Sequence, residues 1–130
     1  MFELRVEHDL VPPPEGEMQW VPCRCFCAVD SFQGEFPLSI TEKEFARFRD
    51  ELNKLRAGDV QTIELENLEM DFRLIMTLRH TGSVSISGKL APGYVKNRAT
   101  LTFDFDSDIA NIDTAARSLS AILKNLQRRS

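Results

Sequence analysis

Residues 72–87 read FRLIMTLRHTGSVSIS, and this stretch decides the fold class. Apolar and polar residues alternate on both sides of Thr81-Gly82, which is typical of two half-buried strands joined by a tight turn. Strands joined in this way pair antiparallel, and antiparallel sheets commonly bury one face and expose the other. The stretch therefore predicts an antiparallel sheet with one solvated face.

Alternation of the same kind predicts further strands on either side of this hairpin. Residues 20–32 are apolar on both faces, which favours a central position in a sheet. Pro37 lies in the next strand and cannot donate to a ladder, so it indicates an edge strand or the end of a strand. The expected strands are residues 2–6, 20–32, 36–40, 60–67, 72–79, 83–87 and 100–106, with a turn at 33–35 and loops at 12–17 and 90–98.

Two amphipathic helices complete the predicted elements. Thr41-Glu42-Lys43-Glu44 has the form of a capping box, and Gly58 marks the end of the helix that follows. Candidate N-caps from Asp106 to Asp108 precede a second helix through Gln127. The two apolar stripes are Phe45, Phe48, Leu52 and Leu55, and Ile109, Ile112, Ala116, Leu119, Leu123 and Leu126.

These elements predict an α+β fold in the order β-β-β-α-β-β-β-β-α, within a single globular domain of residues 1–130. Short hairpins favour one antiparallel sheet of about seven strands, with the two amphipathic helices packed on one face. The other face is then solvated. It is expected to carry Glu64, Glu66, Arg73, Thr77, Arg79, Ser85, Ser87, Thr102, Asp104 and Asp106.

The composition is that of an acidic globular protein, with 16 Lys and Arg against 20 Asp and Glu and a net charge of −4. This balance disfavours nucleic acid as a partner, because binding to a phosphate backbone needs a dense basic surface. No apolar run approaches the ~18 residues of a membrane helix, and the N-terminal residues do not form a signal peptide. We expect a cytoplasmic protein that binds neither nucleic acid nor membrane. The residues do not specify an oligomeric state.

Three cysteines, Cys23, Cys25 and Cys27, alternate along one expected strand and therefore point to one face, with neighbours about 6.7 Å apart. Zinc sites usually use a C-x₂₋₄-C spacing with a second pair elsewhere, and His8 and His80 have no such context. Buried core thiols are favoured over a metal site or a redox role. An odd number of cysteines also fits a reducing cytoplasm.

No motif indicates a catalytic site or a cofactor. The segment from Gly82 to Ile86 resembles part of a hydrolase nucleophile elbow but lacks its second glycine, and its alternation is that of a strand. His80 lies beside a turn and is interpreted as a surface residue. Asp104 and Asp106 share a strand face and could hold a proton or a metal, but acidic strand edges more often keep a sheet soluble. We expect a protein that is not an enzyme, with no catalytic residues, no cofactor and no metal.

Strand, turn and helix motifs along nearly the whole chain form a set that is shared with a known family. They are Met1-Phe2-Glu3-Leu4, Trp20-Val21, Phe32-x-Gly34-x-Phe36, Thr41…Phe45…Phe48…Leu52, Glu64-x-Glu66, the segment from Gly82 to Gly88, and the segment from Leu101 to Asp108. With these motifs the chain resembles the WapI-like family of bacterial immunity proteins, which are encoded beside contact-dependent toxins. The resemblance implies no catalytic residues. It implies a protein that binds a cognate toxin, one that attacks nucleic acid, and blocks it.

A candidate partner-binding surface is the solvated sheet face. Its proposed contact residues are the outward carboxylates Glu64, Glu66, Asp104 and Asp106, together with Arg73 and Arg79. Nuclease toxins carry basic clefts, which an acidic inhibitor can occupy as a phosphate mimic. An ordinary wet sheet face explains the same residues. Two functions stay open: an immunity protein, and a small ligand- or protein-binding α+β module of unknown partner.

Overall fold

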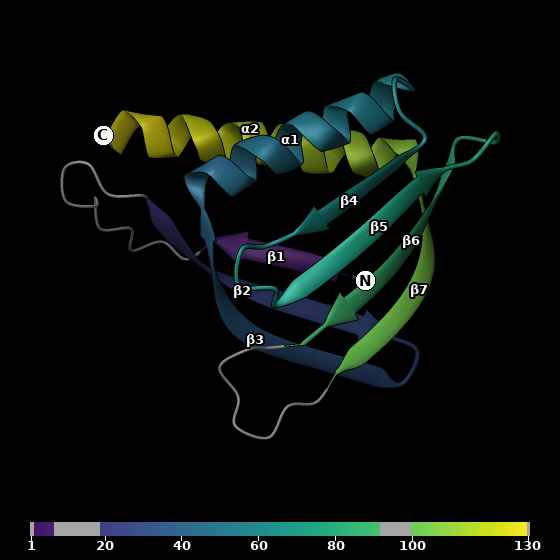
Figure 1. Ribbon diagram of the computed structural model, residues 1–130, viewed down its shortest axis with the longest axis horizontal. Coiled ribbons are helices and arrows are strands. Elements are labelled where there is room, and N and C mark those ends of the chain that lie inside the picture. Colours follow the sequence, from purple (N-terminus) through teal and green to yellow (C-terminus); the bar gives the residue numbers. More distant parts are fainter. Residues whose placement is uncertain (1, 7–18, 92–99, 130) are drawn as a thin grey trace.

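The residues that the structure describes form seven strands and two helices, which follow one another in the predicted order (Figure 1). The computed structural model describes residues 2–6, 19–91 and 100–129. The elements are β1 (Phe2–Val6), β2 (Trp20–Val29), β3 (Phe32–Thr41), α1 (Glu42–Ala57), β4 (Thr62–Glu66), β5 (Phe72–Leu78), β6 (Ser83–Leu90), β7 (Leu101–Asp108) and α2 (Ile109–Arg129).

The strands form two antiparallel sheets, so the prediction of one seven-stranded sheet is wrong. One sheet has the order β1-β2-β3, and the other has the order β4-β5-β6-β7. The division falls where α1 separates β3 from β4, so no hairpin joins these two strands. Alternation in the sequence shows which side chains face the core, but it does not choose the partner of a strand. The α+β class and the antiparallel pairing are confirmed.

The apolar faces of both sheets contribute to one core. Phe2 of β1 lies against the other sheet, with its ring centroid 5.8 Å from that of Phe72 and 6.3 Å from that of Phe103. Phe48 of α1 reaches the same cluster, 6.0 Å from Phe72. Both outer faces are consequently left to solvent, one on each sheet.

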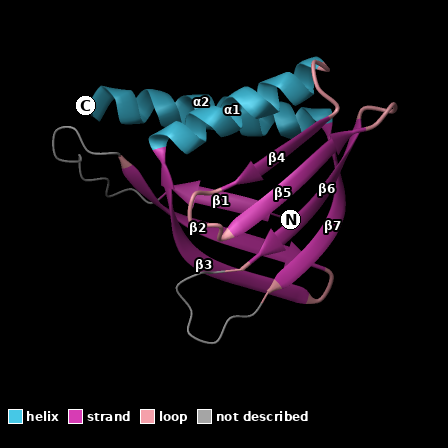
Figure 2. Cartoon of the chain, viewed as in Figure 1, coloured by secondary structure: helices cyan, strands magenta, loops and turns pink. Residues whose placement is uncertain are grey.

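The two helices lie side by side along one side of the molecule and run in opposite directions (Figure 2). α1 contacts β3 and β4, and α2 contacts β7, so the pair packs on edge strands of both sheets. The expected packing on one face of a single sheet is therefore wrong. The stripes themselves are confirmed, because the predicted residues of α1 are buried and those of α2 are buried or half-buried. No helix in the described part of the chain is long and apolar enough to span a bilayer.

Local signals decide the ends of these elements. The Thr41 hydroxyl accepts the Glu44 N–H at 3.2 Å, the Glu44 carboxylate accepts the Thr41 N–H at 3.5 Å, and Gly58 ends α1 in the left-handed conformation. The turn predicted at 33–35 is wrong. The chain turns at Asp30 and Ser31, because Asp30 takes a φ of 53°, which aspartate tolerates better than most residues, and Gly34 stays extended within β3.

Several other local predictions are confirmed. β2 is the central strand of its sheet and β3 is an edge strand, as the apolar faces and Pro37 indicated. Gly82 forms the β5–β6 turn with a φ of 79°. β6 extends through Leu90, into the segment expected to be a loop, because Leu90 pairs with Leu101. The expected loop at 12–17 and the rest of the loop after Leu90, from residue 92 on, lie outside the described residues.

Candidate functional site

The six predicted contact residues lie on one surface, the outer face of the four-stranded sheet. Their strand neighbours Leu65, Leu74 and Phe103 point inward and are buried, so the alternate positions point outward. Glu64 and Glu66 lie on β4, Arg73 on β5, Arg79 just after β5, and Asp104 and Asp106 on β7. We call this surface the four-strand face. Strands about 4.8 Å apart make it about 14 Å wide from β4 to β7.

On the β4 side of the four-strand face, acidic and basic groups pair. Arg73 Nε donates to Glu64 Oε1 at 2.6 Å, and Glu66 lies directly across from Arg73 in the strand register. The hydrogen bond from Arg73 holds the pKa of Glu64 below its usual value and raises the pKa of Arg73. Lys89 of β6 lies across from Arg73 on the other side, so two bases lie beside the two acids on the β4 side.

On the β7 side, the carboxylates lie across from serines. Ser87 Oγ donates to Asp104 Oδ1 at 2.6 Å, and Asp106 is the register partner of Ser85. Ser85 in turn accepts a hydrogen bond from Arg79 Nη2 at 2.9 Å. A hydroxyl fixes the position of a carboxylate but does not cancel its charge. The acidic excess of the four-strand face therefore lies along β7.

Sequence reasoning missed two members of this surface. Asp108 ends β7 and accepts the Asn111 N–H at 2.9 Å, so it caps α2 and extends the acidic row. Lys89 adds a second base to the β4 side, across from Arg73. Both residues occupy outward positions at the ends of their strands. The alternation of apolar and polar residues could have identified them once the register was known.

The outer face of the three-stranded sheet, which we call the three-strand face, is balanced in charge. Arg24 Nη1 pairs with Glu35 Oε1 at 3.1 Å, and Arg5 pairs with Glu3. The Arg5 guanidinium also lies 4.4 Å from the centre of the Phe26 ring. The Arg24–Glu35 pair and the Arg5–Phe26 contact join neighbouring strands, whereas Arg5 and Glu3 pair within β1. Among the described residues, these pairs set two acids against two bases.

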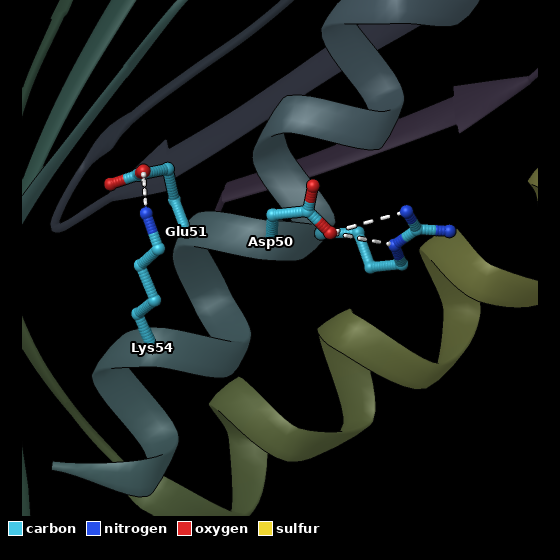
Figure 3. A network of polar contacts seen from close by, with 4 residues as sticks. Asp50, Glu51 and Lys54 are labelled. Carbon is cyan, nitrogen blue, oxygen red and sulfur yellow. Dashed lines mark hydrogen bonds and ion pairs between the residues drawn. The ribbon is translucent and has the colours of Figure 1, made fainter. Parts of the chain in front are cut away.

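The helices carry their charges in pairs as well. On α1, Lys54 Nζ lies 3.5 Å from Glu51 Oε1, and Asp50 accepts a hydrogen bond from the neighbouring Arg49 (Figure 3). A hollow of about 370 Å³ lies between α1 and α2. Asp113 at its edge pairs with Arg56 at 2.8 Å and with Arg117 at 3.0 Å. This hollow contains none of the predicted contact residues.

The cysteine row belongs to the core. Cys23, Cys25 and Cys27 are free thiols, each at most 2% exposed. Burial raises the pKa of Cys25 to about 12 and also raises that of Cys27, which keeps both thiols protonated and unreactive at neutral pH. Within the ranges that the structure describes, no three His, Cys, Asp or Glu side chains gather as metal ligands would.

Comparison with known proteins identifies the family. The model of the immunity protein WapI-like family matches residues 2–127. The chain belongs to this family. The match confirms the resemblance carried by the strand and helix motifs and assigns the protein an immunity role.

The fold of this immunity protein is similar to that of a solved structure. A chain of the CdiA-CT/CdiI toxin and immunity complex from Enterobacter cloacae aligns with a TM-score of 0.54 at 12% identity, over 93% of this chain and 99% of that chain. A chain of the MRP1/MRP2 structures from Trypanosoma brucei aligns with a TM-score of 0.44 at 15% identity, over 94% of this chain and 73% of that one. No curated protein matches the sequence.

Proposed function

We propose that this immunity protein binds a cognate nuclease toxin in the cytoplasm and blocks it without any enzymatic step. The observation that carries the proposal is the four-strand face, where Asp104 and Asp106 project from β7 across from serines. Membership of an immunity family supports a toxin as the partner. The likeness in fold to a chain of a toxin and immunity complex agrees with this assignment.

The chemistry of a nuclease explains why an acidic face would inhibit it. A nuclease needs a cationic cleft to bind a phosphate backbone, and carboxylates can occupy such a cleft in place of phosphates. Asp104 and Asp106 are fixed on a paired strand, and Asp104 is further held by Ser87. Little conformational entropy is lost when groups held in this way bind. Arg73 and Arg79 would contact carboxylates at the rim of the cleft and fix the orientation of the toxin.

The function is tested with the protein encoded by the gene immediately upstream. We expect that protein to cleave RNA or DNA, and we expect cleavage to stop when one equivalent of the immunity protein has been added. The amount needed for full inhibition separates a stoichiometric inhibitor from an enzyme. Failure to bind at micromolar concentration, or full inhibition by a small fraction of an equivalent, would contradict the proposal.

The binding surface is tested by matched charge reversals on the two sheets. One variant carries Glu64→Lys and Asp104→Lys on the four-strand face, and its control carries Glu3→Lys and Glu35→Lys on the three-strand face. Both variants change the net charge equally, so only the position of the charge differs. We expect the first pair to slow association at low salt about tenfold or more, since steering depends on charge near the contact.

The control should change the association rate less than about threefold in the same stopped-flow measurement. Equal slowing by both pairs would mean that only the net charge matters. Slowing by the control pair alone would move the contact to the three-strand face.

A further inference from the structure

Three large hydrophobic side chains are exposed among the described residues, and two of them, Leu68 and Met70, lie two residues apart in the β4–β5 turn. Trp20 is 40% exposed, Leu68 66% and Met70 68%. Trp20 is the register partner of Thr41, the N-cap of α1, and the Leu68 N–H donates to Glu44 Oε2 in the first turn of α1 at 3.0 Å. Figure 1 shows the start of β2, the start of α1 and the β4–β5 turn on one side of the molecule. Single exposed apolar residues are ordinary, whereas a group of them points to an interaction site.

Buried polar groups hold the β4–β5 turn that carries Leu68 and Met70. Asn67 and Asp71 are at most 3% exposed. Asn67 Oδ1 accepts the N–H groups of Asp71 at 2.7 Å and Phe72 at 3.2 Å, while Asn67 Nδ2 donates to Asp71 Oδ2 at 2.9 Å. The Met70 N–H donates to the Asn67 carbonyl at 2.9 Å. This network fixes the backbone of the turn before any partner binds.

The conformation of the turn is unusual for the residues it contains. Met70 has a φ of 59°, a left-handed conformation that favours glycine and strains a residue with a side chain. Strain of this kind persists where the surrounding contacts impose it. The buried network imposes it here, and the result is two apolar side chains held in solvent with the exposed Glu69 close to both in sequence.

We propose that Leu68 and Met70 are apolar anchors that insert into a pocket on the toxin. The inference rests on the proposed function, since it assigns further contacts to the same partner. The turn directly follows Glu66 and precedes Arg73, both on the four-strand face, so the anchors continue that surface at one end. Glu66 precedes the anchors and Glu69 lies between them, which fits an apolar pocket bordered by cations in a basic toxin. Side chains on a preformed turn lose little conformational entropy on binding, and Met is enriched at protein interfaces.

The anchors are tested by measuring toxin binding to the double variant Leu68→Ser and Met70→Ser. We expect the dissociation constant to rise about a hundredfold, mostly through faster dissociation. The midpoint of urea unfolding should stay close to that of the native protein, because both side chains are exposed. A matched control, Leu68→Met with Met70→Leu, keeps apolar side chains of similar volume and should bind within about threefold of the native protein.

The outcomes separate this inference from the proposed function. If the native protein binds the toxin and the serine variant binds equally well, the anchors are refuted and the proposed function stands. If the native protein does not bind, both are refuted. If sedimentation shows a native dimer that the serine variant dissolves while toxin binding is unchanged, the patch joins two copies of this chain and the assignment to the toxin is wrong.

Discussion

The two sheets are alike on their inner faces and different on their outer faces. Both contribute an alternating row of buried apolar residues to the same core. On the three-strand face, Arg24 pairs with Glu35 across neighbouring strands and Arg5 pairs with Glu3. On the four-strand face, the carboxylates of β7 lie across from serines, and among the residues that the structure describes only the β4 side has an acid paired with a base.

The contrast between the two outer faces determines where charge is available to a partner. An ion pair within a face gives at most modest stability and leaves little field outside it. A carboxylate held by a hydroxyl keeps its charge and its position, which is what fast and specific association needs. The net charge of the whole chain, −4, hides this contrast between the two sheets.

The largest expected effect compares one glycine from each sheet. Gly88 of β6 and Gly34 of β3 both occupy inward register positions, opposite Phe103 and Cys27. A Cβ at Gly88 would overlap the Phe103 ring, whereas a Cβ at Gly34 would meet nothing within 4 Å. We expect Gly88→Ala to lower the free energy of unfolding by about 2–3 kcal/mol in urea, and Gly34→Ala to change it by less than about 1 kcal/mol. Similar losses at both positions would mean that the Phe103 ring does not limit the space at Gly88.

A smaller effect is expected from the two hairpin turns. Asn67→Ala removes the partner of two buried N–H groups and of the Asp71 carboxylate, so it should cost about 2 kcal/mol of unfolding free energy. Ser31→Ala in the exposed β2–β3 turn is the control and should stay within about 0.5 kcal/mol. If the two variants lose the same unfolding free energy in chemical denaturation, the Asn67 network does not stabilise the β4–β5 turn.

The smallest expected effect concerns the thiols, which only the three-stranded sheet contains. The unfolded Cys25 thiol loses its proton above about pH 9, whereas the folded thiol, with its pKa at about 12, keeps it. The unfolded chain then binds fewer protons, so the free energy of unfolding falls as pH rises from 9 towards 12, by about 1 kcal/mol over the first unit. Urea unfolding at pH 8.5 and 10 measures this slope, and Cys25→Ala should make it shallower. If the Cys25→Ala variant keeps the slope of the native protein, a group other than Cys25 causes the pH dependence.

Elements of this fold could be predicted where the signal is local. The capping box at Thr41 and Glu44, the central position of β2 and the outward positions of the four-strand face follow from residues close together in sequence. The division into two sheets could not, because alternation is the same whether β3 and β4 pair or face each other across a core. The turn at Asp30 was missed because a glycine three residues after Ser31 is the stronger turn signal in sequence.

The same limit applies to the candidate site. Alternation placed Glu64 and Asp104 on an outward face, but only the register shows that one lies beside Arg73 and the other across from Ser87. The exposed pair Leu68 and Met70 had no sequence signal, because their exposure follows from a network that Asn67 and Asp71 form within the fold.

The most direct test of the four-strand face is carboxylate labelling in the free protein and in the toxin complex. A carbodiimide couples an amine to exposed carboxylates, and mass spectrometry reports the labelled positions. Glu64, Asp104 and Asp106 should be labelled in the free protein and protected in the complex, while Glu3 and Glu35 are labelled in both. Protection of Glu3 and Glu35 with continued labelling of the other three would contradict the account.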